Sequence, residues 1–187
     1  RGTARRDHPF PPADTAPSVI VTSRRVDQVK AEAQAKKGVA VVTQPDMRWG
    51  RCDIKTVGLL PNVLAKQAAR EVGAYESWLV DELGLVTEGT STNAWIVTSD
   101  GELVTRHVGD QILSGITRAT LIKLAEEPGV PLVERSFTVA EALSAREAFV
   151  TSATSFVTPV TRVDDTVIGN GRAGSVAMGM LDTYLEY

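Results

Sequence analysis

The chain has 187 residues, a net charge of −3 and a pI near 5.5, with 43% hydrophobic and 23% charged residues. This length allows one domain with a buried core or two small ones, and the acidic balance argues against nucleic acid as a main partner. The chain has no apolar run near the roughly 20 residues of a membrane helix, which argues against a membrane protein.

One cysteine and two histidines limit the chemistry further. A single Cys52 excludes an internal disulfide and a cysteine-based zinc cluster, and so few ligands offer no metal site of the usual spacing. This cysteine usage is typical of a reducing compartment, and we expect a cytoplasmic protein.

The first half of the chain predicts an open N-terminal stretch followed by alternating elements. Four prolines predict an extended loop over residues 9–17. The segment after Pro61 and before Gly73 is bounded as helices usually are. The patterns predict strands over 18–22, 39–43, 49–55 and 75–80 and helices over 26–37 and 62–72.

The second half predicts short strands interrupted by helices. Thr138 and Glu141 have the spacing of a capping box that opens a short helix. The irregular mixture of strands and helices indicates an α+β fold. Strands are predicted over 94–98, 103–105, 130–135, 148–152, 157–160 and 166–168, and further helices over 116–126 and from 174 onward.

Lys55 and Glu88 lie in segments that suggest chemistry. Lys55 ends a predicted strand with apolar neighbours, and an amine attacks an aldehyde only when it is neutral, which an apolar wall favours. Glu88 lies in a stretch of small polar residues, 87–93, where a carboxylate could pair with a ring nitrogen. Taken alone, Lys55 is better explained as a solvated lysine, and Glu88 as a solvated residue of a polar turn.

Two segments suggest an anion site. Residues 115–118, Gly-Ile-Thr-Arg, open a predicted helix, and the free N–H groups of a first helical turn bind anions. Residues 151–155, Thr-Ser-Ala-Thr-Ser, follow a predicted strand and could supply further donors. Small polar turns are common, so neither segment identifies a ligand by itself.

Together these segments resemble the fold-type IV pyridoxal-phosphate aminotransferases, and among these the D-amino acid aminotransferases most. The resemblance runs through nearly all of the chain, and residues 48–55 and 59–66 match the lysine motif almost without gaps. It implies an α+β fold, with 1–17 as the end of an N-terminal domain and interdomain loop and 18–187 as the C-terminal cofactor-binding domain. Because position 1 is not methionine, we expect a longer polypeptide with a small domain before it.

The resemblance also implies a role for individual residues. Lys55 would form the Schiff base with pyridoxal 5′-phosphate and move the substrate proton, and Glu88 would hold the pyridine nitrogen protonated. Leu113 would pack on one ring face. The phosphate would be bound by Gly115, Ile116, Thr117, Ser152 and Ala153, although relatives usually have threonine where this chain has Ala153.

The first eight residues carry the substrate signal. They resemble the D-amino acid aminotransferase segment whose arginine and histidine hold the substrate carboxylate, which assigns that role to Arg6 and His8, with Arg5 as an alternative partner. We therefore expect transamination between a D-amino acid, such as D-alanine, and a 2-oxo acid by a homodimer. The alternatives are a branched-chain aminotransferase, an aminodeoxychorismate lyase, or a non-catalytic fragment that binds phosphate.

Overall fold

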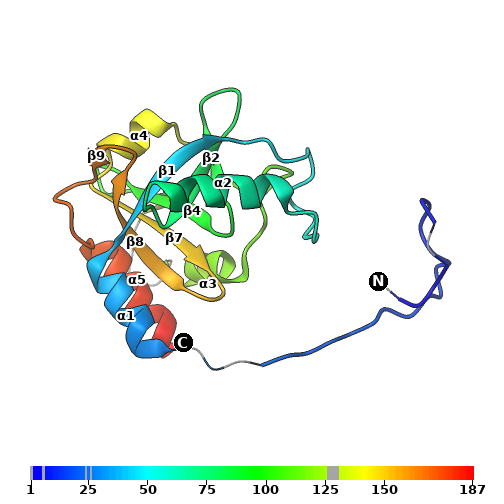
Figure 1. Cartoon of the computed structure of the whole chain (residues 1–187). Helices are drawn as coiled ribbons and strands as arrows, with labels where there is room; N and C mark the ends of the chain where they lie inside the picture. The colour runs from blue at the N-terminus through cyan, green and yellow to red at the C-terminus, as the bar shows by residue number, and fades with distance from the viewer. Residues whose placement is uncertain (1, 6, 24, 26, 126–130) are drawn as a thin grey trace.

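The computed structural model describes residues 2–5, 7–23, 25, 27–125 and 131–187. Nine strands of these residues form one mixed sheet, in the order β3-β2-β1-β8-β7-β4-β5-β6 with β9 beside β8 (Figure 1). The α+β prediction is confirmed. The strands are β1 (Val39–Pro45), β2 (Glu76–Val80), β3 (Val86–Gly89), β4 (Asn93–Val97), β5 (Leu103–Thr105), β6 (Leu132–Glu134), β7 (Glu147–Ser152), β8 (Phe156–Val163) and β9 (Thr166–Val167).

The sheet is buried on both faces, as β4 shows. Successive side chains of a strand point to opposite faces, so Ala94 and Ile96 enter one core cluster, whereas Trp95 and Val97 enter the other. Trp95 stacks on Phe149 of β7 with ring centroids 5.4 Å apart. This double burial explains why the central strands are almost continuously apolar in sequence.

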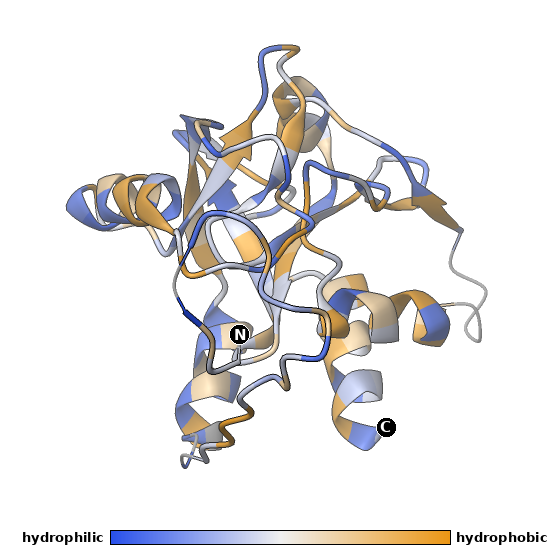
Figure 2. Cartoon of the chain, turned by 90° about the vertical axis from the view of Figure 1, so that its right-hand side faces the viewer, coloured by the Kyte–Doolittle hydropathy of each residue, from blue (hydrophilic) through white to orange (hydrophobic). Residues whose placement is uncertain are grey.

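Five helices among the described residues cover the sheet, and they carry hydrophobic and hydrophilic residues in alternation (Figure 2). The helices α1 and α5 lie side by side in Figure 1, and α3 contacts α5. Helix α2 packs on β2, where the Ser77 hydroxyl donates to the Ala65 carbonyl at 2.6 Å. The helices are α1 (Gln28–Lys37), α2 (Leu60–Glu71), α3 (Ile116–Ala125), α4 (Val139–Ser144) and α5 (Ser175–Glu186).

The N-terminus of α5 is held by a strand residue distant in sequence. Glu147 of β7 accepts from the backbone N–H groups of Val176 and Ala177, at 3.1 and 3.0 Å. A Cβ at Gly174 would lie 2.0 Å from the Glu147 carboxyl carbon, so a glycine precedes the helix. The carboxylate thus satisfies free helical N–H groups and faces the positive end of the helix.

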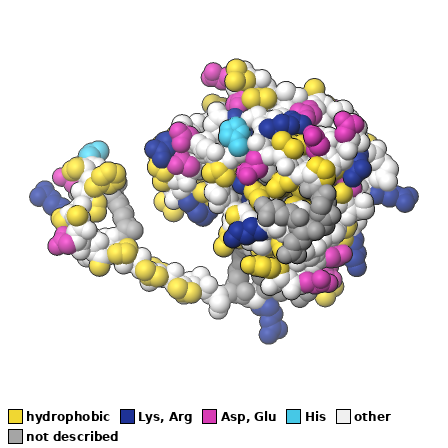
Figure 3. Space-filling view, turned by 180° about the vertical axis from the view of Figure 1, so that it is seen from behind, with side chains coloured by type: hydrophobic (Ala, Val, Ile, Leu, Met, Phe, Trp, Pro, Cys, Tyr) yellow, Lys and Arg dark blue, Asp and Glu magenta, His cyan; other side chains and the backbone are white. Residues whose placement is uncertain are grey.

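Two predicted strands are wrong. Residues 18–22 form no strand, because no other described segment lies beside them to accept their backbone hydrogen bonds; they belong to an arm that stands off the body (Figure 3). Residues 49–55 form a loop, since the chain leaves the sheet after Pro45. There the backbone N–H of Cys52 donates to Asp110 instead of a neighbouring strand.

The other predicted elements are confirmed with shifted ends, except that residues 26 and 126–130 lie outside the described residues. The capping box is half formed. The Thr138 hydroxyl accepts from the Glu141 N–H at 3.1 Å, but the Glu141 carboxylate pairs with Arg135. A cation on the neighbouring segment therefore replaces the backbone N–H as the partner of Glu141.

Candidate functional site

Glu88 is the centre of the candidate site. Its side chain is buried on β3, and within the described residues three groups donate to its carboxylate. The Asn93 amide donates at 2.9 Å, and the Leu113 backbone N–H lies 3.1 and 3.2 Å from the two oxygens. The third donor is the Arg48 guanidinium. Each carboxylate oxygen thus makes two contacts, and the Leu113 N–H is shared between the two oxygens.

The electrostatic environment makes Glu88 unusually basic. Burial raises the pKa of Glu88 to about 7, against the lowering effect of Arg48 and of the Leu113 N–H. Buried carboxylates with such a raised pKa are concentrated at functional sites. A carboxylate of this basicity can share a proton with a ring nitrogen of similar pKa.

Asn93 joins Glu88 to the segment that leads into α3. Its amide nitrogen also donates to the Leu113 carbonyl at 2.9 Å. The approach of Asn93 leaves no space for a side chain at Gly115, where a Cβ would lie 2.3 Å from the Asn93 amide oxygen. The glycine of the predicted anion motif is thus required by close contact with the residue that holds Glu88.

The N-terminus of α3 has the features of an anion site. Gly115 accepts the first helical hydrogen bond, from the Ala119 N–H at 2.9 Å, which leaves the N–H groups of residues 116–118 without a helical acceptor. The Thr117 hydroxyl is buried without a hydrogen-bond partner among the described residues. Ile116 is 72% exposed, so this end of the helix faces solvent.

The end of β7 lies beside this site through strand pairing. Thr151 is the register partner of Asn93, which places Ser152 and Ala153 next to the Glu88 network. The Ser152 hydroxyl accepts from the Ser155 N–H at 3.2 Å, and Ala153 is exposed. Both predicted phosphate segments thus lie near Asn93, Gly115 through close contact with its amide and Ser152 through the pairing of Thr151.

Lys55 lies in the exposed loop between β1 and α2 and not on a strand as predicted. Its side chain makes no hydrogen bond or ion pair with the described residues. The loop itself is tied to the site, because Arg48 contacts Glu88 and the Cys52 N–H donates to the Asp110 carbonyl at 2.7 Å. The structure thus anchors the lysine loop at the site without joining Lys55 to Glu88.

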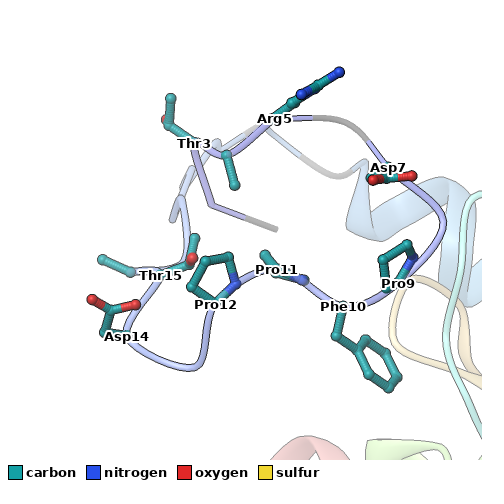
Figure 4. Close-up of a pocket in the computed structure, with 11 residues that line it drawn as sticks. Thr3, Arg5, Asp7, Pro9, Phe10, Pro11, Pro12, Asp14 and Thr15 are labelled. Carbon is teal, nitrogen blue, oxygen red and sulfur yellow. The ribbon is translucent and has the colours of Figure 1, made fainter.

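Of the predicted substrate residues Arg6 and His8, the structure describes only His8, in the N-terminal arm. Arg6 is outside the described residues, and His8 is exposed. A hollow of about 660 Å³ is lined by arm residues between Thr3 and Ala16, and Arg5 points away from it (Figure 4). Because no residue of the sheet lines this hollow, it is separate from the site around Glu88.

Sequence reasoning missed two members of the site. Arg48 and Asn93 both lie in the motif segments, but no role was predicted for either. Their signal was an arginine and an amide in otherwise apolar or small-residue surroundings, where a long polar side chain needs a partner. The free N–H groups at the start of α3 suit an anionic group of a ligand, and the Glu88 carboxylate suits a protonated ring nitrogen.

Comparison with known proteins gives one family. Residues 1–163 match the model described as amino-transferase class IV. A D-alanine aminotransferase of Bacillus licheniformis is 42% identical over 93% of this chain and 60% of its own length. One of Staphylococcus aureus is 37% identical over 100% of this chain and 65% of its own. The chain thus spans less than two thirds of these relatives.

Solved structures agree with this fold. A branched-chain aminotransferase of Escherichia coli matches with a TM-score of 0.79 and 27% identity, over 95% of this chain and 58% of its own. A branched-chain amino acid aminotransferase of Thermobaculum terrenum, in its PLP-form, matches with a TM-score of 0.72 and 26% identity, over 80% and 50%. The helices of the described residues are all too short or too polar to cross a membrane.

Proposed function

We propose, from the premise that the chain belongs to the class IV amino-transferase family, that it serves transamination between a D-amino acid and a 2-oxo acid, with pyridoxal 5′-phosphate as cofactor. The observation that carries this proposal is the buried Glu88 carboxylate with its raised pKa, beside a helix N-terminus with an unpartnered Thr117 hydroxyl. The substrate class rests on the D-alanine aminotransferases that share 37–42% of their residues with the chain.

The cofactor would be held at two points. The N–H groups of Ile116 and Thr117 and the unpartnered Thr117 hydroxyl would bind the phosphate, with Gly115, Ser152 and the Ala153 N–H beside it. Leu113 would pack on the ring. An orphaned buried hydroxyl costs free energy, so its presence at a helix N-terminus supports a missing acceptor there.

The chemistry would divide between Glu88 and Lys55. The bound cofactor supplies a ring that withdraws electrons from the substrate α-carbon. Glu88 would hold the proton at the ring nitrogen, which its raised pKa favours. Lys55 would attach the cofactor covalently, and once the substrate amine displaces it, its freed amine would move the proton from the α-carbon, for which an exposed lysine on a loop has the necessary freedom.

The N-terminal arm would serve the substrate. We assign Arg6 and His8 to the substrate carboxylate on the resemblance of residues 1–8, since an arginine fork suits a planar carboxylate. We also assign residues 1–17 to the end of a preceding domain and 18–187 to the cofactor-binding domain. This division rests on the resemblance, since the arm that stands off the body also includes residues 18–22 (Figure 3).

A substrate panel tests the function. The purified protein, loaded with pyridoxal phosphate, should transfer the amino group of D-alanine to 2-oxoglutarate and prefer D-alanine to L-alanine. Covalent cofactor should give a yellow protein that borohydride bleaches. A colourless protein that only retains phosphate would contradict the proposal and favour a non-catalytic phosphate-binding fragment.

A branched-chain aminotransferase is the second candidate. The structural neighbours named above favour it, because they share the fold at TM-scores of 0.72 and 0.79. L-leucine in the same panel separates the two candidates. A preference for L-leucine over D-alanine would replace the D-specific proposal and keep the family and cofactor, and aminodeoxychorismate in the panel tests the lyase alternative.

We further propose that the protein acts as a homodimer in the cytoplasm. The loop 46–59 and α2 expose large apolar side chains, including Val57 at 99%, that a second copy could cover. The single cysteine is compatible with a reducing compartment.

A further inference from the structure

Arg48 is a buried cation shared by two carboxylates. Its side chain is 7% exposed and lies at the start of the loop that carries Lys55. The Nε and Nη2 atoms donate to the two oxygens of Asp46 at 2.9 and 2.7 Å, in the bidentate geometry of a strong ion pair. The remaining nitrogen, Nη1, donates to Glu88.

The backbone and a hydroxyl fix this arrangement from other sides. Nη2 also donates to the Gln111 carbonyl at 2.9 Å. The Thr87 hydroxyl donates to Asp46 at 2.7 Å, beside Glu88 on β3. Arg48 therefore connects the lysine loop, β3 and the segment before α3, and its position is set independently of any ligand.

The two carboxylates compete for one cation. The charged or titratable groups around Glu88 are Arg48, Asp46 and Cys52, all in the loop after β1, whereas β4 and the segment before α3 present the neutral donors Asn93 and Leu113. Asp46 occupies two of the arginine nitrogens, so Glu88 receives only part of the positive charge. Removing the Arg48 charge should thus raise the pKa of Glu88, and removing the Asp46 charge should lower it.

We propose that Arg48 is a positioning residue that orients Glu88 and favours its ionised form, and that Asp46 takes up part of the Arg48 charge so that Glu88 stays basic enough to share a proton with a bound donor. The importance of this arrangement for catalysis rests on the proposed function. The charge balance supports it, because burial raises the pKa of Glu88 to about 7, Arg48 opposes that rise, and Asp46 adds to it.

The test is a titration of Glu88 in the cofactor-free protein by infrared spectroscopy. The band of the protonated carboxyl is assigned by its loss in Glu88→Gln. We expect a wild-type midpoint near pH 7. Arg48→Met should raise the midpoint by about one pH unit or more, and Asp46→Asn should lower it, because the guanidinium then acts on Glu88 alone.

Arg51→Met is the matched control. Arg51 lies in the same loop and also pairs with an aspartate, Asp53, but its side chain is 51% exposed and does not contact Glu88. This variant should leave the midpoint unchanged. If Arg48→Met fails to fold by circular dichroism, Arg48→Lys replaces it, and a smaller upward shift is expected because a lysine keeps the charge and loses the fork.

An Arg48→Met midpoint no higher than that of Arg51→Met would overturn the proposal, as would a rise in Asp46→Asn. A purely structural arginine would give no shifts of opposite sign in the two variants. Because the titration needs neither cofactor nor substrate, it separates a failure of this inference from a failure of the proposed transaminase activity.

Discussion

At the scale of single residues, the buried Glu88 carboxylate should make stability depend on pH. Its pKa is raised from 4.5 to about 7 in the folded protein, so the folded state favours the protonated form. The stability from that form is complete below pH 4.5 and is lost as the pH rises through 7. The loss is about 3 kcal/mol, as an upper bound.

Glu88→Gln should remove this dependence, because an amide does not titrate in this range. In the cofactor-free protein, urea unfolding should be measured at several values between about pH 5 and pH 8. Over this range the free energy of unfolding of the wild type should fall relative to that of the variant by up to about 3 kcal/mol. Parallel stability curves for the two proteins would contradict the raised pKa. In the loaded enzyme, the same substitution should retain the cofactor but slow turnover by an order of magnitude or more.

Lys55→Ala should abolish the borohydride-stable link to pyridoxal phosphate, since Lys55 supplies the proposed attachment point. Mass spectrometry after reduction measures the link directly. Lys123→Ala is the control, because Lys123 lies on α3, away from the loop that carries Lys55. A link that persists at wild-type level in Lys55→Ala would mean that another lysine holds the cofactor.

Of the site residues, Glu88, Gly115 and Thr117 could be predicted from motif strings, and the structure joins them through contacts that no string contains. Asn93 donates to Glu88 and to the Leu113 carbonyl before α3 at once, a double contact that only the folded chain makes. Arg48 is 40 residues from Glu88 in sequence, so its role follows from tertiary packing.

At the scale of elements, α5 depends on Glu147 for its N-terminus. Glu147→Ala should lower the free energy of unfolding by about 2 kcal/mol, because it leaves the N–H groups of Val176 and Ala177 without an acceptor. Urea denaturation measures the change. Glu186→Ala, at the exposed far end of the same helix, should change stability by less than about 0.5 kcal/mol.

Equal effects of the two glutamate substitutions would show that the Glu147 contact contributes nothing.

The sequence offered no hint of this contact, because a helix cap supplied by a strand much earlier in the chain has no local pattern. By contrast, Thr138 lies next to its helix, and its half of the capping box was predictable.

The wrong strand predictions fall on segments that have no paired strand, and not on segments whose residues disfavour strands. Residues 18–22 are as β-branched as β1, yet they have no paired neighbour among the described residues, and a strand needs a partner for its backbone groups. Residues 49–55 were predicted as a strand, but the chain leaves the sheet after Pro45, and they have no paired neighbour either. The ladder contacts of the central strands involve residues far apart in sequence, which local patterns do not specify.

At the scale of the whole molecule, the exposed apolar face of α2 should mediate self-association. Leu60 and Leu64 are one helical turn apart and are 67% and 62% exposed. Aspartate at both positions should shift the protein from dimer to monomer in sedimentation equilibrium. Leu83→Asp is the control, since Leu83 is also exposed but lies in the turn between β2 and β3.

A wild-type protein that sediments as a monomer would contradict the dimer, and a dimer unaffected by the α2 substitutions would place the interface elsewhere.

The α+β class and most elements were predictable because amphipathic helices and buried strands have strong local patterns. The strand order was not, since β1 lies between β2 and β8, which are far apart in the chain.

The hydrogen bond from Cys52 to Asp110 couples two segments that otherwise share no secondary structure. One carries Lys55, and the other leads through Leu113 into α3. The Cys52 amide can exchange its hydrogen with deuterated water only when these segments separate. Its exchange rate therefore reports how often the loop that carries Lys55 leaves the segment before α3. We expect that rate to fall when pyridoxal phosphate spans both segments.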